Sequence, residues 1–161
     1  MTYKEIQCDL FELDLNEYWF VQCISADFAM GKGIALKFYE VFDVKNGMTN
    51  MYDRDVVNAL WNRYKGFCLI YGHTFNLITK EHYWDKPTID TMRNALKDLK
   101  DWCIYLRQFL LFMKRTECKL AMPRIGCGLD KLKWEQVRDL IHEIFDDTDV
   151  DITVCYQEWN K

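Results

Sequence analysis

The sequence predicts a single α/β domain in which helices cover both faces of a mixed sheet. Short runs of β-forming residues alternate along the chain with segments in which apolar residues recur at helical spacing. Two neighbouring β-forming runs are separated only by Gly72 and His73, which indicates an antiparallel hairpin within the sheet. No internal repeat, low-complexity segment or linker is present, so we expect one domain over residues 1–161.

Six segments are expected to be strands, because β-branched, aromatic and other apolar residues are concentrated in them and polar residues or glycines bound them. Several of these segments are apolar on both faces, as strands covered by helices on both sides should be. In chain order they are residues 3–8, 18–25, 66–71, 74–79, 119–123 and 149–156.

Helical patterns occupy most of the chain between these strands. Residues 33 to about 42 are expected to be helical, and residues 46–62 are expected to contain one short helix. Longer amphipathic helices are predicted over residues 88–114 and from about Trp134 onward, where apolar residues recur every three or four positions. Thr88 stands where the first of these longer helices begins, so we expect it to be the N-cap residue.

Composition and charge exclude several classes of protein. Half of the residues are hydrophobic, which excludes a disordered chain, and a net charge of −4 gives no basic footprint for an extended nucleic-acid surface. No apolar run is long enough to span a membrane, and the N-terminus lacks the features of a secretory leader. The seven cysteines include no Cys-x-x-Cys pair and the three histidines are far apart. We therefore expect no metal site and a reducing compartment, the cytoplasm, or the nucleus if the source is eukaryotic.

More than half of the glycines lie in two Gly-x-Gly pairs, each of which follows a predicted strand. Gly31 and Gly33 stand at the start of a predicted helix, where backbone N–H groups and the helix dipole can bind a phosphate. The spacing does not match the Rossmann fingerprint, because Leu36 occupies the position of its third glycine, and the Gly-Lys-Ser/Thr of a Walker loop is missing. The alternative interpretation is a glycine-rich turn without a ligand.

Gly126 and Gly128 form the second pair, after the strand predicted over residues 119–123 and before a predicted helix. Ligands of α/β sheets bind at the carboxyl ends of the strands, so the two glycine pairs together could hold both phosphates of a diphosphate. Asp130 ends this second loop and is either a general acid or base or a residue that caps the helix.

Lys80 directly follows the strand predicted over residues 74–79. A partly desolvated lysine at a strand end can act as an amine nucleophile or pair with a phosphate, and the alternative is a solvated surface lysine. The neighbouring Tyr83 and Trp84 form an aromatic pair, which could simply cover the core.

Three segments resemble the macrodomain family, and specifically the branch that includes the terminal ADP-ribose protein glycohydrolase. They are CISADFAMGKGIALKF, then LITK followed by a Lys-Pro, then MPRIGCGLDKLKWEQV, and they occur in the family's order before a C-terminal ITV strand. The resemblance begins at Cys8-Asp9-Leu10-Phe11, where the family has Gly-Asp-Leu-Phe, and covers nearly the whole chain. It implies a three-layer α/β/α fold that binds ADP-ribose.

The same resemblance implies roles for individual residues. In that branch, the lysine matching Lys80 attacks the anomeric carbon of the distal ribose once the sugar ring has opened, and the aspartate matching Asp130 supplies acid and base help. Ser25 matches a serine that lines the distal ribose, Asp9 and Leu10 are expected at the adenine, and both glycine loops at the diphosphate. The expected ligand-binding residues are Asp9, Leu10, Ser25, Met30, Gly31, Lys32, Gly33, Ile34, Pro123, Ile125, Gly126, Cys127, Gly128, Leu129 and Tyr156.

The activity implied by the resemblance is hydrolysis that removes ADP-ribose from a modified macromolecule, with acidic side chains of proteins as the attachment point. Lys80 and Asp130 suffice for this chemistry without a cofactor, and we expect a monomer whose partner is ADP-ribose or an ADP-ribosylated macromolecule. Three alternatives stay open: ADP-ribose on DNA, since Lys32 between the glycines makes the motif similar to that of antitoxin macrodomains; small derivatives such as O-acetyl-ADP-ribose or ADP-ribose 1″-phosphate; and a non-catalytic reader. Cys8 and Tyr156 depart from the family's pattern at the adenine end.

Overall fold

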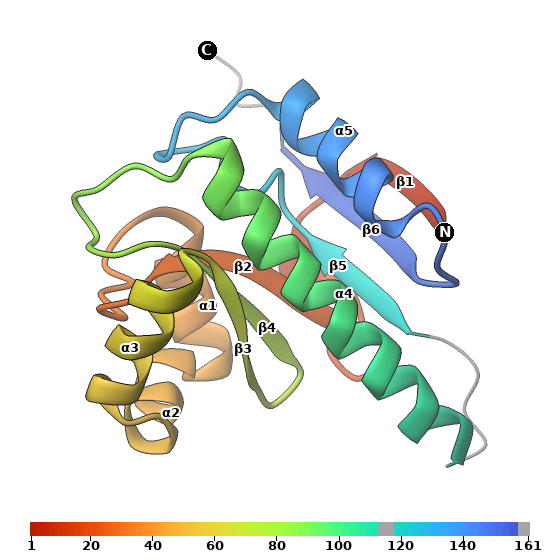
Figure 1. Ribbon diagram of the computed structural model, residues 1–161. Coiled ribbons are helices and arrows are strands. Elements are labelled where there is room, and N and C mark those ends of the chain that lie inside the picture. Colours follow the sequence, from red (N-terminus) through yellow and green to blue (C-terminus); the bar gives the residue numbers. More distant parts are fainter. Residues whose placement is uncertain (113–117, 158–161) are drawn as a thin grey trace.

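Six strands form one mixed sheet in the order β1-β6-β5-β2-β4-β3 (Figure 1). The structure is a computed structural model that describes residues 1–112 and 118–157. Neighbouring strands are parallel except for β3 and β4, which form an antiparallel hairpin. The short connection at Gly72 and His73 predicts this hairpin, and the expectation of a mixed sheet is confirmed.

All six predicted strands are present, and their bounds differ from the predicted ones by one or two residues. Lys80 is the last residue of β4, one residue beyond the predicted end of that strand at Thr79. The strands are β1 Thr2–Gln7, β2 Trp19–Ser25, β3 Phe67–Tyr71, β4 Thr74–Lys80, β5 Lys119–Met122 and β6 Asp151–Tyr156.

Helices cover both faces of this sheet, as the sequence predicts. Figure 1 shows α4 and α5 on one face and α1 on the other. The helices of the described chain are the 3₁₀ helix η1 Leu10–Glu12 and the α-helices α1 Gly33–Phe42, α2 Val44–Met51, α3 Arg54–Tyr64, α4 Ile89–Phe112 and α5 Trp134–Phe145.

The short helix predicted within residues 46–62 is present, but the region holds two helices, α2 and α3, where the sequence predicts one. The break comes from Asp53, whose Oδ1 accepts hydrogen bonds from the N–H groups of Asp55, at 2.9 Å, and Val56, at 3.2 Å. A carboxylate in this position begins a new helix. The apolar pattern hid the break because it joined residues of both helices into one stripe.

The predicted start of α4 is confirmed, and its predicted end at Lys114 lies outside the described residues. The Thr88 Oγ1 accepts a hydrogen bond from the Thr91 N–H at 3.1 Å, and the Thr88 N–H in turn donates to the Thr91 Oγ1 at 3.0 Å. This reciprocal pair satisfies N–H groups that have no partner within the helix.

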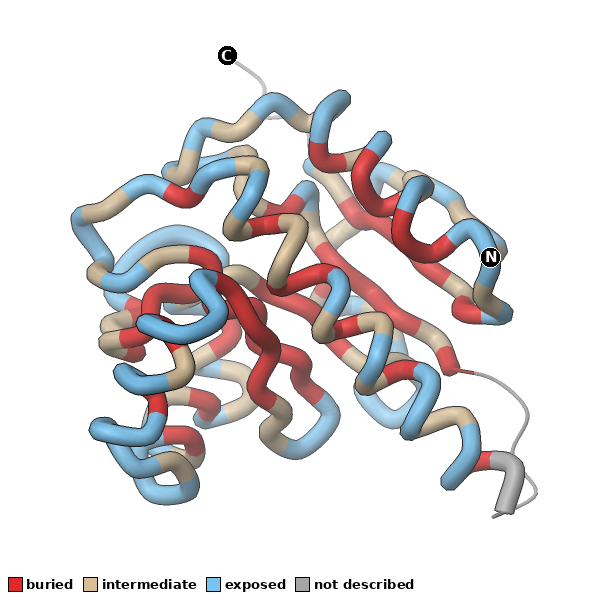
Figure 2. Tube along the Cα trace, in the orientation of Figure 1, coloured by how far each residue is buried: buried red, intermediate tan, exposed pale blue. Residues whose placement is uncertain are grey.

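The core has one part on each face of the sheet. Leu99 of α4 and Ile141 of α5 are fully buried against one face, whereas Phe38 of α1 and Met48 of α2 are fully buried on the opposite side. Figure 2 shows the buried residues along the strands and on the inner sides of the helices. Both faces are therefore filled, and the connections at the strand ends are where a ligand can be held.

Two further observations concern the environment of the protein. Within residues 1–112 and 118–157, no helix has the length and apolar character needed to cross a membrane. All seven cysteines are free thiols.

Candidate active site

The parallel strands bring the segments that follow them to one edge of the sheet. β1 leads to Asp9, β4 ends at Lys80 and β6 ends at Tyr156. β2 leads into residues 26–33, called here the first glycine loop, and β5 leads into residues 123–133, the second glycine loop. The carboxyl edge is where open α/β sheets bind ligands, and the topology brings the predicted segments together there.

Lys80 and Asp130 form an ion pair at this edge, with 2.7 Å between Nζ and Oδ1. Their side chains are only 13% and 16% exposed, so the attraction between the charges is screened less than on an open surface. Asp130 does not cap α5, because Lys133 is the N-cap residue of that helix. The helix-cap interpretation of Asp130 is therefore wrong, and its role as a general acid or base stays a prediction.

The backbone of β4 at Lys80 is fixed by β2. Ser25 lies opposite Lys80, but Ile24 lies opposite Ile78, so β4 has one extra residue in this stretch. The Ala26 N–H donates a hydrogen bond to the Lys80 carbonyl at 2.9 Å. The first glycine loop thus begins directly beside the amine-bearing residue.

Cys23 lies close to the ion pair but is not a competing nucleophile. Burial raises the pKa of its thiol well above the ordinary value; Asp130 and Cys127 raise this pKa further, while Lys80 lowers it. Only the thiolate of a cysteine is nucleophilic, and this thiol stays protonated near neutral pH. Lys80 is therefore the candidate nucleophile of this part of the site.

Asp27 holds the first glycine loop in its conformation. Its Oδ1 accepts a hydrogen bond from the Ser25 hydroxyl and another from the Ala29 N–H at 3.1 Å. Phe28 and Met30, on either side of Ala29, have φ angles of 56° and 46°, which non-glycine residues rarely adopt. Such residues persist only where the surrounding structure fixes them, and Asp27 supplies part of that constraint.

The first glycine loop leads into the N-terminus of α1. Lys32 is the N-cap residue, and its side chain makes no capping hydrogen bond. Gly33, the first helical residue, has a φ of 61°, and Gly31 and Ile34 beside it are exposed. In the described structure the first N–H groups of α1 are thus left without a side-chain cap, as an anion site requires.

The second glycine loop folds back on itself and touches the first. The Leu132 N–H donates to the Gly126 carbonyl at 2.8 Å, and Gly126 has a φ of 74°. The Leu129 side chain lies against Gly33: a Cβ at Gly33 would be 3.2 Å from the Leu129 Cδ1. The two glycine loops, predicted to share one ligand, are therefore in contact.

A third segment, residues 81–87, leaves β4 after Lys80 and lies against both glycine loops. The Tyr83 N–H donates to the Asp27 Oδ2 at 2.9 Å, in the first glycine loop. The Lys86 Nζ donates to the Leu129 carbonyl at 2.7 Å, in the second. The segment consequently bridges the two loops beside the ion pair.

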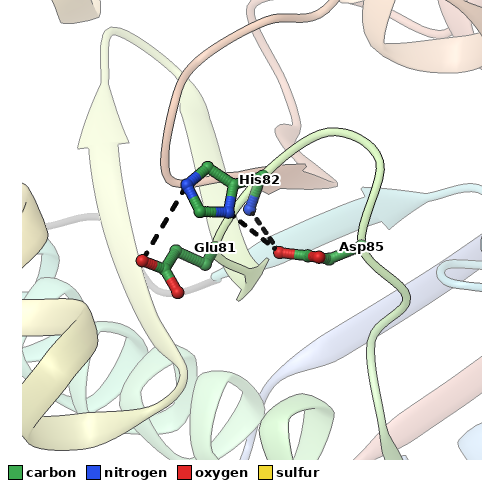
Figure 3. Close-up of side chains that lie close together, drawn as sticks. All are labelled: Glu81, His82 and Asp85. Carbon is green, nitrogen blue, oxygen red and sulfur yellow. Dashed lines mark hydrogen bonds and ion pairs between the residues drawn. The ribbon is translucent and has the colours of Figure 1, made fainter.

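His82 lies between two carboxylates within this segment (Figure 3). Its Nδ1 is 3.2 Å from the Asp85 Oδ2, its backbone N–H donates to that same oxygen at 3.0 Å, and its Nε2 is 3.9 Å from the Glu81 Oε1. The imidazole also stacks on Trp84, with ring centroids 4.4 Å apart. Ligand-type atoms of Glu81, His82 and Asp85 lie within 4.8 Å of one another. Because the Asp85 contacts close a turn, we assign this cluster a structural role.

The residues expected at the adenine lie at the other end of the edge. The Asp9 Oδ1 accepts a hydrogen bond from the Phe11 N–H at 3.0 Å and so caps η1, whose Leu10 is buried. The guanidinium of Arg124 lies over the Tyr156 ring, 4.2 Å from its centroid. With Arg124 in place, an adenine base can stack only on the other face of that ring.

The remaining predicted residues differ in what they can offer a ligand. Ile125 and Met30 are 2% and 4% exposed, so their side chains belong to the core and only their backbone can meet a ligand. Leu129 and Ile34 are 60% and 40% exposed at the mouth of the loops. Burial raises the pKa of the Cys127 thiol to about 11, so this group is neutral as well. Pro123 begins the second glycine loop and Gly128 is exposed within it.

Asp27 and Lys86 hold the loops of the candidate site together, and neither is expected there from the sequence. The Ser-x-Asp spacing after β2 is a usable signal for Asp27, since such a carboxylate can accept hydrogen bonds from the serine and from nearby N–H groups. No local pattern could reveal the contact between Lys86 and Leu129, which lie 43 positions apart.

Comparison with known proteins identifies relatives, although no family model matches the chain. The ADP-ribose glycohydrolase OARD1 of Bos taurus is 38% identical over 134 residues, which are 83% of this chain and 78% of that protein. Its namesake in Homo sapiens is 37% identical over 132 residues, 82% of this chain and 77% of that protein.

Solved structures share the fold. The macrodomain of Thermus aquaticus DarG has a TM-score of 0.65 and 19% sequence identity, and the match covers 98% of this chain and 99% of that one. Thermosipho africanus DarTG in complex with ADP-ribose has a TM-score of 0.64 and 18% identity, over 99% of this chain and 43% of that one. These likenesses confirm the predicted three-layer α/β/α architecture.

Proposed function

This chain belongs to the macrodomain family, in the branch of the ADP-ribose glycohydrolases, and we propose that it removes ADP-ribose from modified macromolecules by hydrolysis. The attachment point we propose is the carboxylate of a glutamate or aspartate side chain in a protein. The observation that carries the proposal is the ion pair of Lys80 and Asp130 beside the two glycine loops. A module that only recognises ADP-ribose has no need of an amine and a carboxylate in this arrangement.

The order of the strands matches the order of the groups in ADP-ribose. Asp9 lies just after β1, and Tyr156 ends β6. The second glycine loop follows β5, the first follows β2, and Lys80 ends β4. With neighbouring strands about 4.8 Å apart, the edge from β1 to β4 is about 19 Å long. An extended ADP-ribose would therefore place its adenine at β1 and β6, its diphosphate on the glycine loops and its distal ribose at Lys80.

The proposed reaction has two steps and releases one proton to solvent. In the first, Asp130 takes a proton from the Lys80 ammonium across the 2.7 Å contact, and the resulting amine attacks C1 of the distal ribose while the C1–O bond to the substrate carboxylate breaks, so that the carboxylate leaves with the bonding electron pair. In the second, water attacks C1, the C1–N bond breaks, the Lys80 amine takes a proton from the attacking water, and protonated Asp130 gives its proton to solvent, which restores the ion pair. Free ADP-ribose and an unmodified acidic side chain are the products.

The cysteines support a reducing compartment such as the cytoplasm as the place of this reaction. All seven thiols are free, and those of Cys103 and Cys118 are hydrogen-bonded neighbours. An oxidising compartment favours disulfides between thiols so close together.

The test of the proposal is release of ADP-ribose from a protein that has been automodified on glutamate. We expect Lys80→Ala and Asp130→Ala each to lower the rate about 100-fold or more, the range for loss of a nucleophile or of a general acid and base. Lys100→Ala is the matched control, because Lys100 pairs with Asp147 at 2.8 Å on the surface, and it should leave the rate unchanged. Wild-type release by both active-site variants would refute the mechanism.

The attachment chemistry is tested with the same enzyme and a panel of substrates. We expect glutamate-linked ADP-ribose to be released faster than ADP-ribose on a thymidine oligonucleotide or in O-acetyl-ADP-ribose. Faster release from the oligonucleotide would keep the hydrolase but replace the protein substrate. Binding of ADP-ribose with no release from any of the three would make the protein a reader.

A further inference from the structure

The carboxylate of Asp27 connects two segments of the site that are far apart in the sequence. Its Oδ1 accepts from the Ser25 hydroxyl and the Ala29 N–H, both near the start of the first glycine loop. Its Oδ2 accepts from the Tyr83 N–H at 2.9 Å, three residues beyond Lys80. The two oxygens of one side chain thus hold the proposed diphosphate loop and the segment that follows the proposed nucleophile.

Asp27 also lies close to Lys80 along the backbone. The residue before it, Ala26, donates its N–H to the Lys80 carbonyl, and Ser25 lies opposite Lys80 in the neighbouring strand. β2 therefore holds Lys80 on one side. On the other side Lys80 leads into residues 81–87, in which the Tyr83 N–H donates to Asp27. Release of Tyr83 would leave the strand end fixed but free the chain immediately after it.

We propose that Asp27 is a positioning residue for the hydrolysis: it sets the placement of the Lys80 amine relative to a diphosphate bound in the first glycine loop. This inference rests on the proposed function, because it concerns the geometry of that reaction. Asp27 acts through Tyr83 and through the loop, and its carboxylate is already occupied by three donors from this chain. A small displacement of reacting groups is costly, since about 1 Å can lower a rate about 100-fold.

Replacement of Asp27 by asparagine distinguishes the contacts of Oδ1 with the first glycine loop from the contact of Oδ2 with Tyr83. An asparagine can keep its amide oxygen at the Oδ1 position, where two donors from the first glycine loop need an acceptor. Its NH₂ group then occupies the Oδ2 position and faces the Tyr83 N–H, so two donors meet and that contact is lost. An alanine removes the contacts of both oxygens. Asp27→Asn should therefore affect catalysis selectively, whereas Asp27→Ala should affect ADP-ribose binding as well.

The experiment measures kcat and KM for release of ADP-ribose from glutamate-modified protein, the Kd of free ADP-ribose by calorimetry, and amide hydrogen exchange of residues 81–87. For Asp27→Asn we expect kcat to fall about 10-fold or more, the Kd to stay within about threefold, and exchange at residues 81–87 to accelerate. For Asp27→Ala we expect the Kd of ADP-ribose to rise in addition to the loss of kcat.

Asp53→Asn is the matched control, because Asp53 also accepts two backbone N–H groups but caps α3, outside the loops of the site. It should lower the unfolding temperature slightly and leave kcat, Kd and exchange at residues 81–87 unchanged. The proposal is overturned if Asp27→Asn keeps a wild-type kcat, or if its exchange at residues 81–87 does not change. Wild type and Lys80→Ala are assayed alongside, so failure of the hydrolase itself shows as an inactive wild type, whatever Asp27→Asn does.

Discussion

Gly126→Ala and Gly128→Ala separate the two reasons for which the second glycine loop can require glycine. Gly126 has a φ of 74°, and a Cβ there would lie 2.7 Å from the Met92 Cε and 3.0 Å from the Leu132 Cδ1. Gly128 has no positive φ, and a Cβ there would meet nothing within 4 Å. The folded chain therefore requires a glycine at 126 but has room for a side chain at 128.

The expected losses of stability follow from these environments. A left-handed L-residue costs about 1–2 kcal/mol, and moving the ends of two flexible side chains adds about 1–2 kcal/mol more, so Gly126→Ala should lose about 2–4 kcal/mol. For a chain of this length that loss lowers the melting temperature by about 5–15 °C. Gly128→Ala should change the free energy of unfolding by less than about 0.5 kcal/mol.

Gly128→Ala, which should hardly change stability, is the variant expected to lose more affinity for ADP-ribose. If the backbone at Gly128 approaches the diphosphate, a methyl group there removes a hydrogen bond to a charged group, which corresponds to about 10-fold or more in Kd. The assay is thermal unfolding without ligand followed by calorimetric titration with ADP-ribose. Wild-type affinity in Gly128→Ala, or equal loss of stability in both variants, would refute this assignment.

Two further predictions concern stability and pH. Thr88→Ala removes the acceptor that caps α4, so thermal unfolding should show a loss of about 1 kcal/mol, with wild-type release of ADP-ribose; an unchanged melting temperature would contradict the capping role. Burial, with a contribution from Glu5, raises the pKa of Tyr3 from 10.0 to about 12, so the folded state favours the neutral phenol and stability should fall as the pH rises from 10 to 12. Tyr3→Phe should make that fall smaller without abolishing it, because Tyr52 and the buried Cys23 also have raised pKa values and still contribute. It should cost nothing near neutral pH, because the described residues give the buried Tyr3 hydroxyl no partner, and chemical denaturation across this pH range with both proteins is the measurement.

Elements with strong local signals could be predicted from the sequence. The helix expected at 33–42 has those bounds, α5 begins at Trp134 as expected, and the hairpin follows its short turn. Periodicity failed between α1 and β3, where Met51 and Val56 are 60% and 54% exposed although both are apolar. Asp53 caps α3 and marks the break between the two helices, which the apolar spacing does not show.

The candidate site was predictable as a set of residues but not as a set of contacts. The motifs predicted Lys80 and Asp130, and the structure pairs them across 50 positions of sequence. Asp27 escaped because its bond to Tyr83 spans 56 positions and depends on β2 and β4 being neighbours. Such contacts depend on the order of the strands in the sheet, which cannot be read from a single sequence.

The extra residue of β4 makes chain length, and not only residue identity, a requirement of this site. Ile78 lies opposite Ile24 and Lys80 opposite Ser25, so Thr79 is the residue that the pairing passes over. Side chains alternate between the faces of a strand, so a deletion of one residue in β4 would turn Lys80 to the opposite face and away from Asp130. A change of length in the turn at Gly72 and His73, at the opposite end of β4, would leave the pairing at Lys80 in place, whereas a residue gained or lost within β4 would keep the lysine and change its position.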